Sequence, residues 1–132
     1  MKALTTLALV ALAACAGGGP TAPVGQEFVI AAGQTAEISG TGLAITFVRV
    51  PEDSRCPLGV LCIQAGNAQV ELLATLNGAP TVLALNTTTN PHDGTVAPYK
   101  IALTGLMPIP RINGPIAQKD YRATLVIGFL PD

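Results

Sequence analysis

Alternation of apolar residues with a period of two is the feature that most restricts what this chain can fold into. From Glu27 onward it recurs in short runs, and no stretch repeats its apolar residues every 3.6 positions as an amphipathic helix would. Successive side chains of a strand point to opposite faces, so each run predicts a strand with one buried face. The apolar members of the runs are Phe28 and Ile30; Leu43, Ile45 and Phe47; Ala68, Val70, Leu72, Ala74 and Leu76; Tyr99, Ile101 and Leu103; and Tyr121, Ala123, Leu125, Ile127 and Phe129.

Residues that favour turns separate these runs. Asn77-Gly78 is a favoured pair for a two-residue hairpin loop, and it predicts a return strand over residues 81–85. The other turn positions are Gly33, Gly40-Thr41-Gly42, Asn90-Pro91 and Asn113-Gly114-Pro115. The pattern predicts an all-β domain, an antiparallel β-sandwich or Greek-key barrel of about seven or eight short strands.

The N-terminus has a different character. Met1 and Lys2 give a positive start, and residues 3–14 carry no charge. A helix of that length would measure about 18 Å, which is too short for the roughly 30 Å of hydrocarbon in a bilayer but suits the apolar part of a signal peptide. We therefore expect residues 1–14 to be a signal peptide.

This segment ends in Leu12-Ala13-Ala14-Cys15, which resembles the lipobox of bacterial lipoproteins. The resemblance implies that Cys15 receives diacylglycerol, that the bond before it is cut, and that acyl chains then anchor the mature chain in a membrane. The alternative is an ordinary secretory signal in which a cysteine falls at this place by chance.

Residues 15–25 are rich in Gly and Pro, which predicts a flexible tether between Cys15 and a single β-domain over residues 26–132. The residue after the cysteine is Ala16, whereas an aspartate there would resemble an inner-membrane retention signal of enterobacteria. We expect a lipid-anchored protein of the bacterial cell envelope, on the periplasmic face of the outer membrane if the organism has two membranes.

Cys56 and Cys62 are the cysteines that remain once Cys15 carries lipid. Behind a signal peptide they should meet an oxidising compartment, so we expect them to form a disulfide. By the chain-entropy estimate, closing this ring of about seven residues would contribute roughly 2.4 kcal/mol.

The segment from Asp53 to about Val70, with its D-S-R-C-P-x-G-V-x-C pattern, resembles a segment of small bacterial envelope β-domains of uncharacterised activity. Relatives of that kind often carry tryptophan where this chain has Gln64. Two interpretations of the segment stay open. It is a stapled connection between strands, with Asp53 accepting backbone hydrogen bonds and Arg55 pairing with an acid, or a presented binding loop whose candidate residues are Asp53, Arg55, Pro57 and Leu58.

Several kinds of chemistry lack their residues. His92 is the single histidine, in a polar run over residues 86–94 that predicts an exposed loop, and it supplies too few ligands for a zinc or copper site. No nucleophile motif or phosphate-binding glycine loop occurs. Without Lys2 the chain has six basic and eight acidic residues and no basic block, which argues against nucleic acid as a partner. We expect no catalytic residue, metal or cofactor.

The proline-containing segment Leu106–Ile112 is apolar yet unsuited to a central strand. It predicts either a crossover that covers a sheet edge or an exposed patch that docks a partner. We therefore expect a lipid-anchored domain that binds or scaffolds, with an envelope protein as a possible partner. The alternatives are a protease inhibitor that presents the Cys56–Cys62 loop, and a hydrolase in which Asp53, Arg55, Asp120 and Arg122 converge in one cleft.

Overall fold

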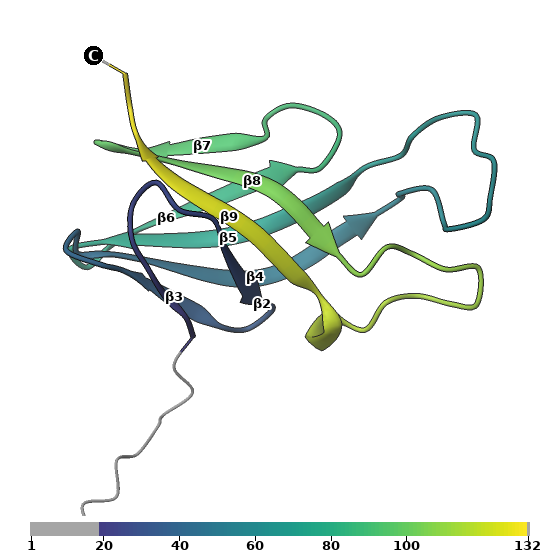
Figure 1. Ribbon diagram of the computed structural model, residues 1–132, viewed down its shortest axis with the longest axis horizontal. Coiled ribbons are helices and arrows are strands. Elements are labelled where there is room, and N and C mark those ends of the chain that lie inside the picture. The colour runs from purple at the N-terminus through teal and green to yellow at the C-terminus, as the bar shows by residue number, and fades with distance from the viewer. Residues whose placement is uncertain (1–18, 132) are drawn as a thin grey trace, which may run out of the picture.

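The computed structural model describes residues 19–131, which form nine strands and one short 3-10 helix (Figure 1). The strands are β1 (Thr21–Ala22), β2 (Phe28–Ala31), β3 (Thr35–Ile38), β4 (Leu43–Asp53), β5 (Ala68–Leu76), β6 (Ala79–Asn86), β7 (Asp93–Val96), β8 (Tyr99–Met107) and β9 (Arg122–Phe129), and the helix is η1 (Gln118–Asp120). The predicted signal peptide and Cys15 lie outside the described residues. Within residues 19–131, no helix has the length and apolarity needed to cross a membrane.

The strands form two sheets that face each other. One has the order β1-β3-β4-β5-β6 and the other has the order β2-β9-β8-β7. All pairings are antiparallel except that of β1 with β3. The predicted all-β class is confirmed, and of the two architectures left open the molecule has the sandwich, because the sheets do not close into a barrel.

The core is made by the alternating residues that the sequence singled out. Ile45 and Phe47 of β4, Leu72 of β5, and Leu125 and Ile127 of β9 are fully buried. They lie on the inner faces of the two sheets, while their neighbours in sequence point outward. The Asn77-Gly78 hairpin is also present, with β6 pairing to β5 from Leu76↔Ala79 onward.

The domain begins earlier in the chain than we predicted. Residues 19–25 were expected to belong to the tether, but β1 lies beside β3 and Ala22 is buried. The Glu37 N–H donates to the Pro20 carbonyl (3.1 Å), and the Gly25 N–H donates to the Ile127 carbonyl (2.7 Å). Backbone hydrogen bonds hold this segment against the sheets. Such bonds need no apolar pattern, so the Gly- and Pro-rich composition wrongly predicted a tether here.

The polar run over residues 86–94 is only partly the exposed loop we predicted. Asn86 is buried at the end of β6, and Asp93 begins β7, which pairs with β8. The side chain of Asn67 organises the turn between them: its amide donates to Asn86 Oδ1 (3.0 Å), and its oxygen accepts from the N–H groups of Thr88 (3.0 Å) and Thr89 (3.2 Å). Polar residues here satisfy backbone groups instead of facing only water.

Candidate functional site

Two loops meet at one end of the sandwich. The cystine loop (residues 54–67) joins β4 to β5, and the proline loop (residues 108–117) joins β8 to β9. Figure 1 shows both at the right-hand end of the molecule, where the teal cystine loop extends farthest. The Leu58 N–H donates to the Pro110 carbonyl (2.9 Å), so the two loops are joined directly.

Arg55 joins the cystine loop to the start of the proline loop. Its guanidinium donates to both carboxylate oxygens of Asp53, with Nε to Oδ1 at 2.9 Å and Nη2 to Oδ2 at 2.8 Å. It also donates to the carbonyls of Leu106 (2.7 Å) and Pro108 (2.9 Å), where the chain leaves β8. The side chains of Arg55 and Asp53 are only 13% and 12% exposed, so this is a nearly buried, bidentate ion pair, and two further guanidinium donors are used by backbone carbonyls.

Tyr121 completes the polar cluster from the other sheet. Its hydroxyl donates to Asp53 Oδ2 (2.8 Å). Burial alone would raise the pKa of Asp53, but the hydrogen bonds from Arg55 and Tyr121 together with the charge of Arg55 outweigh it and hold the pKa below the ordinary 3.8. Burial, followed by the hydrogen bond to Asp53 and its negative charge, raises the pKa of Tyr121 to about 12. At neutral pH, Asp53 is therefore ionised and Tyr121 is protonated.

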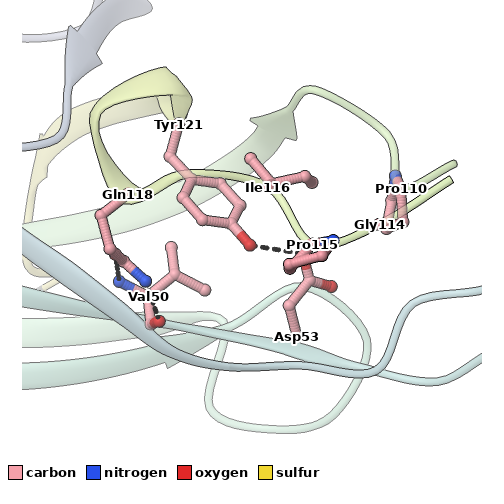
Figure 2. A pocket seen from close by; sticks show the side chains of 8 residues that line it. All are labelled: Val50, Asp53, Pro110, Gly114, Pro115, Ile116, Gln118 and Tyr121. Carbon is pink, nitrogen blue, oxygen red and sulfur yellow. Dashed lines mark hydrogen bonds between the residues drawn. The ribbon is translucent and has the colours of Figure 1, made fainter.

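β4 contains a bulge shortly before Asp53. Strand pairing skips between Arg49↔Glu71 and Glu52↔Gln69, which leaves the backbone of Val50 without a partner on β5. The Gln118 side chain takes that place, since its Oε1 accepts from Val50 N (2.9 Å) and its amide donates to Val50 O (2.8 Å). Figure 2 shows Gln118 reaching down from η1 onto β4.

A cavity of about 260 Å³ lies between β4, η1 and the proline loop. Its lining residues are Val50, Asp53, Pro110, Gly114, Pro115, Ile116, Gln118 and Tyr121 (Figure 2). Asp53 carries the single carboxylate among them, and its charge is already neutralised by Arg55. The polar groups of this wall are therefore used for structure, and no free acid or base is offered to a ligand here.

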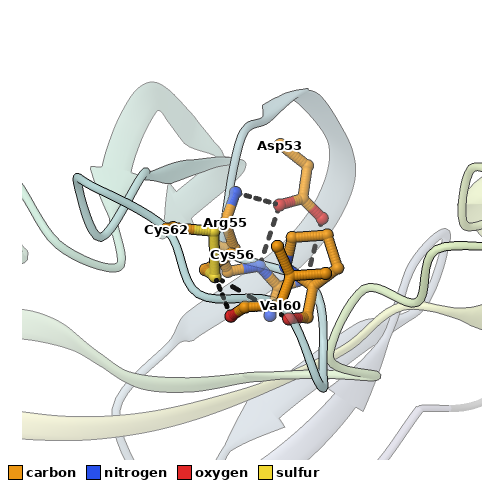
Figure 3. Close-up of a disulfide and its surroundings, with 6 residues drawn as sticks. Asp53, Arg55, Cys56, Val60 and Cys62 are labelled. Atoms are coloured by element: carbon orange, nitrogen blue, oxygen red, sulfur yellow. Dashed lines mark hydrogen bonds and ion pairs between the residues drawn. A yellow bond between two sulfur atoms is a disulfide. The ribbon is translucent and has the colours of Figure 1, made fainter.

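The predicted disulfide between Cys56 and Cys62 is present (Figure 3). The base of the cystine loop is held further by the Cys56 N–H, which donates to the Ala65 carbonyl (3.4 Å), and by the Ser54 N–H, which donates to the Asn67 carbonyl (2.7 Å). Beyond this base the chain projects into solvent.

Large apolar side chains occupy the projecting part. Leu61 and Ile63 are fully exposed, at 102% and 104%, and Leu58 is 55% exposed. We call Leu58, Leu61 and Ile63 the loop tip. The side chains of Leu61 and Ile63 gain little from folding the domain, because they bury almost no apolar surface against it.

The four predicted loop residues fall into two groups. Asp53 and Arg55 form the nearly buried clamp, and the Arg55 N–H also donates to Asp53 Oδ1 (3.2 Å), as the stapled-connection interpretation required. Pro57 is half-buried, while Leu58 has an exposed side chain and a paired backbone. The exposed side chains of the loop are thus those of the loop tip and not those of Asp53 and Arg55.

Sequence reasoning missed the most exposed residues of the loop. Leu61 and Ile63 lie outside the predicted strands, and two large apolar residues within three positions of a turn-rich, disulfide-closed segment were the available signal. The partnership of Tyr121 with Asp53 had no sequence signal, because 68 positions separate them.

The convergence required for a hydrolase is not observed. Asp53 and Arg55 pair with each other, whereas Asp120 and Arg122 are exposed and line neither that cluster nor the cavity. The Arg122 guanidinium donates instead to the carbonyls of Lys119 (2.9 Å) and Tyr121 (3.0 Å). Within residues 19–131, no three His, Cys, Asp or Glu side chains come together as ligands for a metal ion.

Comparison with known proteins gives no relative from which a role could be transferred. No protein-family model, curated protein or solved structure matches the chain.

Proposed function

We propose that this chain is a lipid-anchored protein of the bacterial cell envelope whose β-domain binds a protein partner through the loop tip, without catalysing a reaction. The N-terminal sequence, with its apolar segment and Cys15, supports the anchor. The observation that carries the binding role is the full exposure of Leu61 and Ile63 on a loop whose base is tied by a disulfide and a nearly buried ion pair.

Constraint of the loop supports a binding role on energetic grounds. A loop ordered before contact loses less conformational entropy on binding than a flexible one. Exposed apolar side chains that cluster on such a loop gain free energy when a partner removes them from water. The cystine loop combines both properties, whereas Val29 (54% exposed) and Val82 (68% exposed) are single apolar residues on strands.

The test of binding is partner capture from solubilised envelopes of the source organism. The wild-type chain is compared with Leu61→Ser/Ile63→Ser, and Val29→Ser/Val82→Ser is the matched control, since it removes the same kind of exposed side chain elsewhere. We expect a protein captured by the wild type and by the control to be lost from the loop variant. The same captured proteins from all three chains would remove the loop tip from the binding site.

The anchor has its own measurement, the intact mass of the mature protein. We expect a chain that begins at Cys15 and carries the added mass of diacylglycerol and an acyl group. A mature chain without lipid would contradict the anchor, whatever the capture experiment gives.

A second candidate function is inhibition of an envelope protease by the cystine loop. The specific observation in its favour is that residues 58–64 are exposed on a loop closed by a disulfide, and an exposed, constrained loop is what would enter a protease cleft. Peptidase activity of envelope extracts should then fall on addition of the chain and recover with Leu61→Ser/Ile63→Ser. Unchanged peptidase activity, or cleavage of the loop, would rule this candidate out.

A further inference from the structure

We infer that a second face of the domain, distinct from the loop tip, docks on a bilayer that contains anionic lipid. This face is the segment 107–122, which comprises the proline loop, η1 and the residues that flank them; we call it the basic segment. The inference rests on the proposed lipid anchor at Cys15 and adds to it an orientation of the domain on the membrane.

The first argument is the distribution of charge. Residues 19–131 contain six Lys and Arg residues, and three of them, Arg111, Lys119 and Arg122, lie in the basic segment. The segment has one acid, Asp120. Among the described residues the other three cations each pair with a carboxylate, Arg49 with Glu71, Arg55 with Asp53 and Lys100 with Asp93, whereas these three have no such partner. The uncompensated positive charge of the domain therefore gathers on one segment of a protein whose net charge is negative.

The second argument is apolar exposure in the same segment. Met107, Ile109 and Ile112 are 55%, 41% and 71% exposed. Arg111 bridges to Gly114 across a tight turn, so Ile112 stands at the tip of the proline loop. Exposed apolar side chains beside cations are the combination that binds the boundary between headgroups and acyl chains.

The third argument is where the chain enters the domain. Gly19 lies against Thr35 so closely that a Cβ on it would collide with the Thr35 carbonyl. Three Cα–Cα steps, at most about 11 Å of chain, separate Thr35 from Ala32. The Ala32 N–H donates to the Tyr121 carbonyl (3.1 Å), between Lys119 and Arg122. The entry point thus lies near the Lys119–Arg122 end of the basic segment, and Figure 1 shows β3 and η1 along the same lower border of the molecule.

The fourth argument is the length of chain outside the packed domain. Because residues 20–25 belong to the sandwich, only the four Cα–Cα steps from Cys15 to Gly19 separate the anchor from the point of entry. They reach at most about 14 Å, whereas a tether running to residue 25 would have reached about 36 Å. A lipid on Cys15 must therefore hold the domain against the bilayer on the side where Gly19 enters, and the basic segment lies on that side. In Figure 1 the cystine loop lies above the proline loop at the right-hand end of the molecule. Docking through the basic segment would therefore leave the loop tip open to a protein partner.

The test uses the absence of tryptophan from the chain. Ile112→Trp gives a single reporter in the basic segment, and Val82→Trp on β6 gives a matched reporter, since Val82 is similarly exposed at 68% against 71%. The mature lipidated chains are reconstituted into vesicles of phosphatidylcholine, with or without phosphatidylglycerol, whose acyl chains carry bromine. Emission spectra and quenching of the tryptophan are measured, and flotation of the vesicles shows whether the chain is anchored.

We expect the Ile112→Trp emission to shift to the blue and to be quenched in vesicles that contain phosphatidylglycerol, while Val82→Trp behaves as in water. Arg111→Gln and Lys119→Gln should each lower the ratio of docked to undocked chain about fivefold, and raised salt should act in the same direction, whereas Lys100→Gln should leave the ratio unchanged.

Each other outcome overturns a defined part of the inference. Unquenched Ile112→Trp in a chain that floats with the vesicles would leave the anchor standing and refute docking. Equal quenching without phosphatidylglycerol would refute the requirement for an anionic surface. A chain that carries no lipid and does not float would refute the anchor, and docking with it.

Discussion

The hydroxyl of Tyr121 donates a hydrogen bond of 2.8 Å to Oδ2 of Asp53, the same oxygen that accepts from Arg55. Tyr121 immediately precedes β9 in one sheet, and Asp53 is the last residue of β4 in the other. The contact therefore ties the two sheets together at the end where the loops project. Because Arg55 extends the cluster to the carbonyls of Leu106 and Pro108, one set of polar groups positions both loops.

Asp53→Asn should destabilise the domain by about 3 kcal/mol, because it leaves the charge of Arg55 nearly buried without its counterion. The matched control is Arg49→Gln, which breaks the pair with Glu71 on a surface where the Arg49 side chain is 61% exposed. That variant should change the free energy of unfolding by less than about 1 kcal/mol. Urea denaturation measures both, and equal losses would contradict the structural role of the clamp.

The contribution of Asp53 to stability should depend on acid pH. Its folded pKa lies below the ordinary 3.8, so the contribution is complete above that value and is lost as pH falls through the folded pKa. The difference in unfolding free energy between wild type and Asp53→Asn should stay constant from neutral pH to about pH 4 and then shrink. A difference that does not change with acid would show that the ionised form of Asp53 is not what the clamp needs.

Tyr121→Phe should cost about 1.5 kcal/mol at neutral pH, because it removes one hydrogen bond to a charged group. The pKa of Tyr121 is raised from 10.0 to about 12, so its contribution is complete below pH 10 and is lost as pH rises through about 12. Absorbance of tyrosinate near 295 nm should therefore show an ionisation centred near pH 12 that is missing from Tyr121→Phe. If the ionisation that Tyr121→Phe removes were centred near pH 10 in the wild type, the hydrogen bond to Asp53 would be contradicted.

Gly66→Ala should destabilise the domain by about 3 kcal/mol. Gly66 has a φ of +67°, and a Cβ on it would collide with the Ser54 carbonyl at the base of the cystine loop. Gly59→Ala is the control, since its φ is similar at +79° but no atom lies within 4 Å of the added Cβ, and it should cost about 1 kcal/mol. Thermal unfolding compares them, and equal losses would show that Ser54 is free to move away.

Cys56→Ala/Cys62→Ala should lower the free energy of unfolding by at most about 2.4 kcal/mol. The variant should remain folded, because the hydrogen bonds of Arg55 and Ser54 still close the base of the cystine loop. The loop tip should nevertheless become more mobile, since the ring that carries Leu61 is opened. Limited proteolysis should then cut between residues 57 and 64 in the variant before it cuts the wild type. A globally unfolded variant would mean that the disulfide supports the sandwich and not only the loop.

Alternation in the sequence predicted the strands of the core well. The runs over Leu43–Phe47 and Ala68–Leu76 became the paired centre of one sheet, because their apolar residues could be buried on one face only in extended chain. The strands that escaped prediction are β1, β3 and β7, of two to four residues each. β7 has no buried side chain, and β1 and β3 bury only Ala22, Ala36 and Ile38. Runs of two to four residues are too short for alternation to stand out in the sequence, whereas backbone pairing needs no side-chain pattern.

The candidate site was predicted in part. The disulfide was predicted from two cysteines behind an expected signal peptide, and it is present. Whether Asp53 and Arg55 face solvent or the interior could not be predicted, since that depends on the carbonyls of Leu106 and Pro108 and on Tyr121, all more than 50 positions away along the chain. Their burial moves the exposed role to Leu61 and Ile63.

The sequence by itself determined that residues 26–132 form an all-β domain with a covalently closed loop, because side-chain alternation, turn residues and cysteine count are local properties. Tertiary structure alone decided which residues of that loop are exposed, that residues 20–25 join the sandwich, and that, among residues 19–131, the three cations without a carboxylate partner are Arg111, Lys119 and Arg122. The physical reason is that each of these depends on hydrogen bonds and ion pairs between segments far apart in the chain, whose meeting is dictated by the packing of two sheets.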